Sequence, residues 1–211
     1  MRKLFFLLLA AACTMAAFPA EAGTIAGKIQ VATASTASMT SQQGDKENVV
    51  VWLEDETKAP DTPLRISQKN LEFSPDFLIA VKGQKVEMPN DDDVAHNVFS
   101  FTGPNQFNLG LYAKGEYRTV TFEKTGIVDI FCSIHRHMHA RIFVLPSRYF
   151  AVGHAGQTFA INDVPPGKHI LKAWHERSLM VVKTVIVPKS GTVNLNILLE
   201  PGATPVTSAK E

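Results

Sequence analysis

The sequence predicts an all-β protein built as sandwiches or barrels. Short runs rich in valine, isoleucine, phenylalanine and threonine recur along the chain, and glycine, proline, asparagine and aspartate separate them. The runs recur at intervals of roughly 8–12 residues, which is typical of sandwiches and barrels and argues against alternating strands and helices. No segment keeps a helical hydrophobic period over several turns.

Residues 1–22 have the three parts of a secretory signal peptide. Two basic residues open the segment, residues 4–12 are apolar, and the Ala-Glu-Ala sequence at 20–22 matches a cleavage site. We therefore expect export to the periplasm and a mature chain that starts at Gly23. The apolar run is shorter than the ~20 residues that span a bilayer. A lipid anchor at Cys13 is an alternative, although its surroundings match that signal poorly.

The expected strands cover most of the chain after this segment. They lie near residues 24–33, 47–54, 66–73, 77–82, 85–89, 95–101, 107–112, 117–123, 127–132, 139–145, 148–152, 157–161, 168–175, 179–187 and 191–198. Three other segments lack the pattern. We expect a long hairpin loop at residues 34–46, a linker at 55–65 and a disordered tail at 200–211.

Composition argues against two classes of function. Without residues 1–22 the chain has as many basic as acidic residues, so its formal charge is zero and gives no electrostatic footprint for nucleic acid. No second long apolar run follows, and we expect a soluble mature chain without a membrane span. The length allows one or two domains.

Cysteine usage narrows the function further. The chain has two cysteines, and Cys13 falls in the predicted signal peptide. Cys132 is therefore the only cysteine of an exported chain and has no intramolecular disulfide partner. Such a thiol is either a buried small apolar side chain or a thiolate bound to a metal. The neighbouring residues decide between these two interpretations.

Residues 127–145 place three metal-binding side chains between two expected strands. Cys132, His135 and Met138 follow one another at spacings of three residues. In an extended strand, side chains three residues apart would lie ~10 Å from each other on opposite faces. The three side chains can share one ion only if the chain turns, so we expect a loop here.

A thiolate, an imidazole and a thioether form a soft ligand set. With a second imidazole, the set suits a trigonal copper site with a long bond to methionine, whereas zinc has little use for a thioether. His96 is the natural second imidazole, because it begins an apolar strand 36 residues before Cys132, a distance that accommodates two strands and their turns. The sequence thus predicts one copper ion (Cu⁺/Cu²⁺) per chain at His96, Cys132, His135 and Met138.

Residues 65–146 resemble the cupredoxin family of blue copper proteins. The resemblance lies in the His96-Asn97 pair at a strand start and in the Cys-x-x-His-x-x-Met sequence that begins at Cys132, which is similar to the short loop of amicyanin. It implies a Greek-key β-sandwich with copper near one end, bound by the four ligands named above. It also implies that Asn97 ties the two ligand segments together by hydrogen bonds near Cys132 and Ser133.

Two features near the predicted copper ligands allow more than one interpretation. His137 and His139 flank Met138 and indicate a second, exposed metal site, an altered ligand set, or polar side chains at the rim of the first site. We adopt the last interpretation. Residues 91–93 are three aspartates without the glycine and glutamate spacing of a calcium loop, so we expect a solvated turn. The alternative is that they lend negative potential near the copper, which would steer a basic partner.

Residues 23–58 and 147–199 resemble the carboxypeptidase regulatory-like domain, a small transthyretin-like β-sandwich. The resemblance rests on the Gly-Thr-Ile-Ala-Gly-Lys-Ile run from Gly23 and on the Val-Pro-Pro-Gly turn from Val164. It implies a discontinuous domain into which residues 65–146 are inserted. The whole arrangement resembles exported bacterial proteins described as methylamine-utilisation or plastocyanin-like.

One aromatic cluster and two further histidines are expected to have no functional role. The Trp174-His175-Glu176 sequence predicts a strand-end cluster with the tryptophan packed where the two domains meet, and a ligand or docking role is the alternative. His154 and His169 have no companions nearby in the sequence. We expect both at the surface.

Together these features predict an electron carrier and not an enzyme. A copper ion held in one compromise geometry changes its oxidation state with little rearrangement, and transient redox proteins would donate and accept the electrons. We find no Ser-His-Asp pattern, Walker loop or glycine-rich dinucleotide loop. The alternatives are a periplasmic copper chaperone or storage protein without electron transfer, and a structural exported β-sandwich module.

Overall fold

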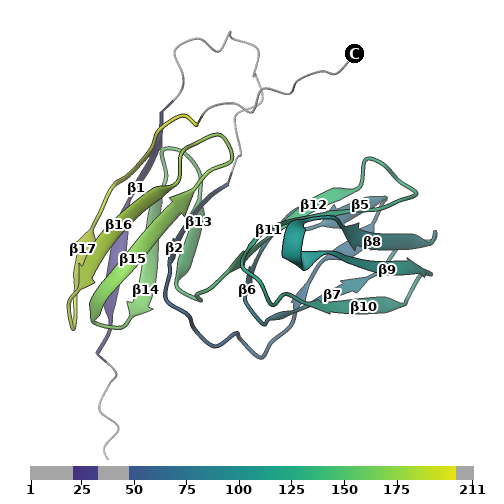
Figure 1. The fold of residues 1–211 in the computed structure, drawn as a ribbon, viewed down its shortest axis with the longest axis horizontal. Coiled ribbons are helices and arrows are strands. Elements are labelled where there is room, and N and C mark those ends of the chain that lie inside the picture. The colour runs from purple at the N-terminus through teal and green to yellow at the C-terminus, as the bar shows by residue number, and fades with distance from the viewer. Residues whose placement is uncertain (1–20, 33–47, 203–211) are drawn as a thin grey trace, which may run out of the picture.

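The chain folds into two β-sandwiches that lie side by side (Figure 1). A computed structural model describes residues 21–32 and 48–202. Within these ranges the one helical element is the 3-10 turn Gly103–Asn105, and no helix has the length and apolar character needed to cross a membrane. The predicted all-β fold class is confirmed.

Several predictions fall on residues outside these ranges. They are the signal peptide up to residue 20 with Cys13, the loop 34–46, and residues 203–211 of the tail. All of them stay predictions.

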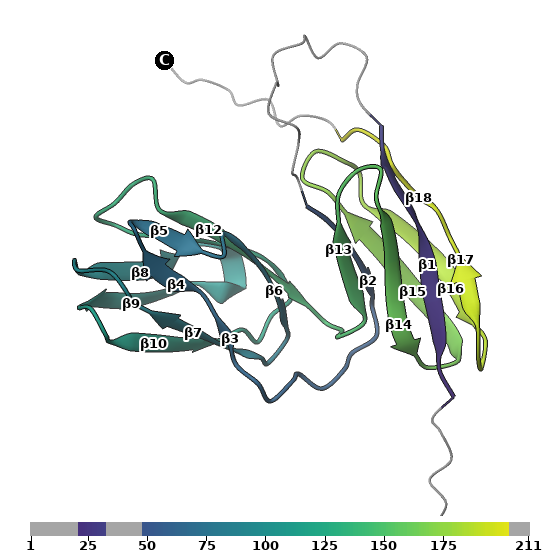
Figure 2. The same ribbon diagram turned by 180° about the vertical axis from the view of Figure 1, so that it is seen from behind.

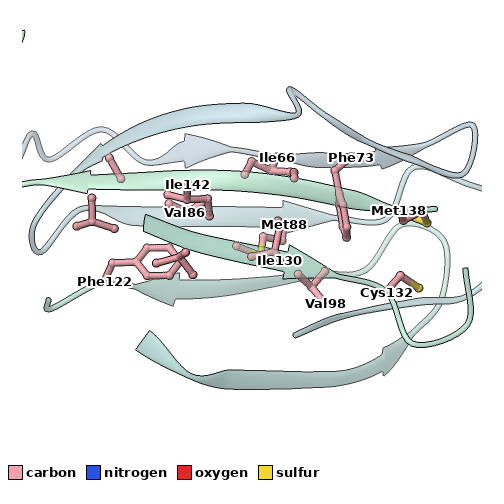
Figure 3. Packing of buried hydrophobic residues seen from close by; sticks show 14 of the residues in the cluster. Ile66, Phe73, Val86, Met88, Val98, Phe122, Ile130, Cys132, Met138 and Ile142 are labelled. Carbon is pink, nitrogen blue, oxygen red and sulfur yellow. The ribbon is translucent and has the colours of Figure 1, made fainter. Parts of the chain in front are cut away.

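The first sandwich is formed by residues 64–145. Its strands are β3 (Leu64–Arg65), β4 (Ser67–Lys69), β5 (Glu72–Ser74), β6 (Phe77–Val81), β7 (Lys85–Pro89), β8 (His96–Ser100), β9 (Phe107–Tyr112), β10 (Tyr117–Thr121), β11 (Gly126–Phe131) and β12 (His139–Leu145). They form the sheets β6-β12-β11-β8-β9 and β10-β7-β3 and the hairpin β4–β5. Apolar side chains fill the interior, with Phe122 towards one end and Cys132 and Met138 at the other (Figure 3).

The second sandwich combines strands from both ends of the described chain. Its strands are β1 (Gly23–Val31), β2 (Val49–Leu53), β13 (Phe150–Gly153), β14 (Thr158–Val164), β15 (Gly167–Trp174), β16 (Val181–Val187), β17 (Thr192–Asn194) and β18 (Ile197–Leu199). One sheet has the order β13-β2-β15-β16, and the other has β14-β1-β17 with β18 also paired to β1 (Figure 2). Alternate residues such as Leu171 and Ala173 point into a second apolar core.

Strand pairing separates the two sandwiches cleanly within the described residues. Strands β3 to β12 pair only with one another, and β1 and β2 pair only with strands from β13 onward. This pattern is what an insertion of residues 65–146 between 23–58 and 147–199 requires. The division of the chain into two domains stays a prediction that the pairing supports.

The predicted strand 66–73 is wrong, because this segment is a hairpin. Asn70 and Leu71 have φ angles of 56° and 61°, so the chain reverses between β4 and β5 through a two-residue turn with left-handed backbone. The side chain of Asp92 accepts hydrogen bonds from both turn amides. A carboxylate distant in sequence stabilises the turn, and the local sequence does not contain that information.

The predicted strand 191–198 is also interrupted, between β17 and β18. The carbonyl oxygen of Leu195 comes so close to β1 that a Cβ atom on Gly27 would lie 1.9 Å from it. The side chain of Asn196 accepts a hydrogen bond from the amide of Lys28 at 2.9 Å. Glycine at position 27 allows this approach.

The other predicted strands are present, and their ends differ from the prediction by a few residues.

A third apolar cluster joins the two sandwiches, and we call it the seam. Phe143 of β12 lies at its centre, with ring centroids 5.3 Å from both Trp52 and Trp174. Beside it, Arg141 and Glu176 form an ion pair at 3.0 Å between the sandwiches. The expected packing of Trp174 where the two parts meet is confirmed.

Truncation of Phe143 at the seam should destabilise the protein strongly. We expect Phe143→Ala to lower the free energy of unfolding by about 3–5 kcal/mol, because a large buried ring leaves a cavity. The measurement is denaturant unfolding followed by fluorescence, since the chain's two tryptophans both contact Phe143.

The matched control is Phe101→Ala. This ring is 74% exposed and contacts Phe99, so its loss should cost at most about 1 kcal/mol. Equal losses in the two variants would contradict the role of the seam.

Candidate metal centre

Three potential ligand atoms converge at one end of the first sandwich. The Sγ atom of Cys132 lies 3.9 Å from Nδ1 of His96 and 3.8 Å from Nδ1 of His135. The two Nδ1 atoms are 3.0 Å apart. Among the described residues this is the one group of three or more His, Cys, Asp or Glu side chains that could hold a metal ion together.

The folding of two sheet strands and one loop produces this convergence. His96 begins β8, and Cys132 follows the end of β11, the neighbouring strand in the five-stranded sheet. The loop from Cys132 to Met138 then returns the chain to β12. The amide of Met138 donates to the carbonyl of His135 at 3.0 Å, and the amide of Cys132 approaches the carbonyl of Met138 at 3.4 Å. The chain therefore turns between the three spaced residues.

Burial differs among the candidate ligands. His96 is 0% exposed and Cys132 is 4% exposed, whereas His135 is half-buried. Met138 is buried in the same apolar cluster as Cys132, and both lie at the same end of that cluster (Figure 3). The site is thus closed towards the core and reaches the surface through one imidazole.

Asn97 connects the two segments that carry the candidate ligands. Its Oδ1 atom accepts hydrogen bonds from the Ser133 amide at 2.7 Å and from the Ser133 hydroxyl at 2.8 Å. Its Nδ2 atom donates to Asn108 at 3.3 Å. Strand β8 and the start of the loop are held together at the residues that follow His96 and Cys132.

Asp92 is a contact of the site that sequence reasoning missed. Its Oδ2 atom lies 2.7 Å from Nε2 of His96 and accepts a hydrogen bond from the Leu71 amide at 2.9 Å. Burial alone would raise the pKa of the Asp92 carboxyl, but hydrogen bonds from the Leu71 amide, the His96 ring and the Asn70 amide together lower this pKa below its ordinary value. The sequence contained one sign of this contact: Asp92 stands four residues before His96, and His96 begins a strand.

The expectation of a solvated turn at residues 91–93 is wrong for its middle residue. The side chain of Asp92 is 12% exposed, whereas that of Asp93 is 88% exposed and pairs with Lys114. Asp91 pairs with Arg65 at 3.0 Å. The chain turns so that each carboxylate meets a different partner. The sequence shows three identical neighbouring residues and does not predict that their environments differ.

The three histidines around Met138 do not share a face, because the loop is not extended. His135 faces Cys132, and His137 is exposed with its ring centroid 6.2 Å from that of His135. His139 lies on β12, where its Nε2 atom is 2.9 Å from Asp129 and its ring stacks on Phe131 at 5.0 Å. Within the loop from Cys132 to Met138, the exposed histidine is therefore His137.

A buried polar network lies beside His96. Tyr112 is the cross-strand partner of His96 in the β8–β9 pair. Its hydroxyl donates to the Met88 carbonyl at 2.8 Å and receives a hydrogen bond from the buried amide of Gln68. Burial raises the pKa of Tyr112 to about 12, an effect that the Gln68 hydrogen bond and the nearby Arg118 partly offset. No pattern in the sequence indicated this network.

His169 was expected at the surface; it is half-buried and has two partners that the sequence did not indicate. Its Nδ1 atom lies 2.8 Å from a carboxylate oxygen of Asp55 and its Nε2 atom lies 2.8 Å from the Pro165 carbonyl. Through these two contacts His169 of β15 links the turn at Pro165 to the chain that leaves β2. His169 belongs to the second sandwich and lies outside the metal centre.

No family model matches the chain, and no curated protein matches it. A copper-containing nitrite reductase from Thermus scotoductus is 28% identical, with a TM-score of 0.38; the match covers 44% of this chain and only 25% of that one.

Two shorter solved structures are matched over nearly their whole length. A purple cupredoxin from Nitrosopumilus maritimus is 25% identical, with 38% of this chain and 98% of that chain covered and a TM-score of 0.35. A variant of amicyanin in its Cu(I) form is 17% identical, with 44% and 97% covered and a TM-score of 0.37. Each likeness covers less than half of this chain.

Removal of the Asn97 side chain should loosen the loop. Asn97→Ala leaves the Ser133 amide without its acceptor, so we expect the free energy of unfolding to fall by about 1–3 kcal/mol. Amide hydrogen exchange at Ser133 should accelerate in the copper-free protein. Asn105→Ala is the control, because its exposed side chain only donates to the Lys124 carbonyl. Unchanged exchange at Ser133 in Asn97→Ala would refute this role.

Tyr112 should make stability fall in alkaline solution. Below pH 10 the folded and unfolded chains both keep the phenolic proton, and above pH 10 the unfolded chain ionises first because the folded pKa is about 12. The free energy of unfolding should therefore fall by up to ~3 kcal/mol between these values. Tyr112→Phe lacks this contribution, so urea unfolding should show its deficit to wild type shrinking as pH rises. A deficit that stays constant would contradict the assignment.

Proposed function

We propose that this chain binds one copper ion through His96, Cys132, His135 and Met138 and carries single electrons between proteins. The observation that carries the proposal is the convergence of one sulfur and two imidazole nitrogens at separations of 3.0–3.9 Å. Such a set next to a buried thioether suits copper better than any other common metal.

The separations fit a single ion between the three atoms. Metal bonds of ~2.0 Å to nitrogen and ~2.3 Å to sulfur, at bond angles near those of a trigonal site, put donor atoms roughly 3–4 Å apart. All three measured separations fall in this range. Zinc would favour further cysteine or histidine ligands, whereas the fourth candidate here is the thioether of Met138.

The surrounding residues are suited to holding such an ion in one geometry. Bound copper would supply one-electron redox chemistry. Hydrogen bonds from Ser133 to Asn97 and the contact of His96 with Asp92 fix both ligand segments. A site that cannot relax presents the same ligands to both oxidation states, which favours rapid electron exchange.

The exposure pattern supports a carrier in preference to an enzyme. Catalytic metal sites keep an open position for substrate, whereas His96 and Cys132 are buried here. Half-buried His135 is the ligand candidate nearest to solvent. We propose that electrons enter and leave through its ring, in transient contacts with a donor and an acceptor protein.

Copper handling without electron transfer is the second candidate. The exposed His137, with its ring 6.2 Å from that of His135, favours it, because a chaperone needs an accessible ligand that can hand over the ion. The two functions predict different copper states. A carrier gives an intensely coloured Cu²⁺ form, and a chaperone or storage protein gives a colourless Cu⁺ form that resists oxidation.

The proposed location and domain arrangement rest on the sequence and on the strand pairing. Residues 1–22 are the basis for proposing export to the periplasm. Residues 65–146 would be a cupredoxin domain inserted in a regulatory-like β-sandwich of residues 23–58 and 147–199, an arrangement that the strand pairing supports.

Replacement of the sulfur tests the proposal directly. The copper-loaded protein should contain one copper per chain and show a strong thiolate charge-transfer band. Cys132→Ser should abolish the band and keep the β-sheet circular dichroism, because serine is nearly isosteric. His137→Asn, which changes an exposed histidine of the same loop, should keep both colour and stoichiometry.

Three outcomes would contradict the proposal. Full colour in Cys132→Ser would exclude the thiolate as a ligand. A colourless complex that resists oxidation would favour copper handling. A wild-type chain that takes up no copper would leave only a structural role.

A further inference from the structure

We propose that Asp92 is a positioning residue that fixes the tautomer and orientation of His96 and couples the metal centre to the β4–β5 turn. This inference rests on the proposed function and deepens it. It assigns a role to one carboxylate among three adjacent ones, of which only the middle one contacts the centre.

Three donors converge on the Asp92 carboxylate. The amides of Asn70 and Leu71 donate to its two oxygens, and Nε2 of His96 lies 2.7 Å from Oδ2. An ionised carboxylate only accepts hydrogen bonds, so the proton of this contact belongs to the histidine. A neutral imidazole carries one N–H, and the lone pair is then left on Nδ1.

The Nδ1 atom is the nitrogen that faces the other ligand candidates. It lies 3.9 Å from Sγ of Cys132 and 3.0 Å from Nδ1 of His135. The hydrogen bond on one side of the ring therefore selects the nitrogen available on the other side. Because His96 is 0% exposed, water does not compete for either position.

The position of Asp92 is itself fixed. Its amide donates to Oδ1 of Asn90 at 2.9 Å, and the Asn90 side chain donates to the carbonyls of Val94 and Tyr112. The carboxylate is thus held from its own backbone as well as from the β4–β5 turn. The ring of His96 cannot rotate without breaking a contact to an anchored group.

Two consequences for a bound ion follow from this arrangement. A hydrogen-bonded carboxylate makes the imidazole a stronger donor and lowers the entropy lost when the ring binds metal. The negative charge next to the ring also favours Cu²⁺ over Cu⁺. Asp92 should therefore tighten copper binding and lower the reduction potential.

The first experiment needs no copper. Long-range ¹H–¹⁵N correlation spectra of the copper-free wild-type chain at neutral pH should show His96 with its proton on Nε2. A predominant Nδ1–H form would overturn the proposal. This measurement stays decisive even if copper does not bind, so a failure of the proposed function and a failure of this inference can be told apart.

The second experiment compares two variants that remove the same charge. Asp92→Asn offers one acceptor oxygen and one NH₂ group, so at least one of the three donors meets another donor. We expect the Nε2–H preference to be lost, the copper dissociation constant to rise about 10–100-fold, and the reduction potential to rise. Asp93→Asn should leave all three quantities unchanged, because Asp93 is 88% exposed and pairs with Lys114.

A purely structural role makes a different prediction. If Asp92 served only to stabilise the β4–β5 turn, Asp92→Asn would lower the unfolding free energy while tautomer and potential stayed as in wild type, and the inference would be wrong. Equal shifts in Asp93→Asn would also overturn it, because charge alone would then explain the effect. Should Asp92→Asn fail to fold, the wild-type tautomer still decides the proposal.

Discussion

The adjacency of β8 and β11 is the constraint on which the candidate metal centre depends. His96 and Cys132 are 36 residues apart, and they meet because the two strands that carry them are neighbours in one sheet. Hydrogen bonds from Ser133 to Asn97 hold β8 and β11 together where β11 ends and the loop begins. The geometry at the centre is therefore a property of the sheet, and the loop only completes it.

Polar groups inside the first sandwich are arranged around the same end of the core. Asp92 and Tyr112 flank His96, and each has hydrogen-bond partners that are themselves anchored. In a low-dielectric interior such contacts are strong when satisfied and costly when broken. The contact with Asp92 holds His96 in place at one end of a core that is otherwise mainly apolar.

Much of the fold and the three converging side chains could be predicted from sequence, and the failures share one cause. Strand positions follow from local alternation, and the spacing from Cys132 to Met138 already required a turn. The hairpin at Asn70, the contact of Asp92 with His96 and the partner of His169 depend on side chains that meet only once the chain has folded, and the first and last of these contacts join residues distant in sequence. A single sequence contains no record of which distant carboxylate a turn or a histidine will meet.

The loop between β11 and β12 contacts strand β8 at two points besides its ends, through Ser133 to Asn97 and through His135 to His96. The loop lies between Phe131 and His139, which form the last pair of the β11–β12 ladder. Phe143 of the seam pairs with Ile127 near the opposite end of the same ladder. Because Cys132 and Met138 belong to the core of the first sandwich, only residues 133–137 could be exchanged for a segment of another length without altering that core.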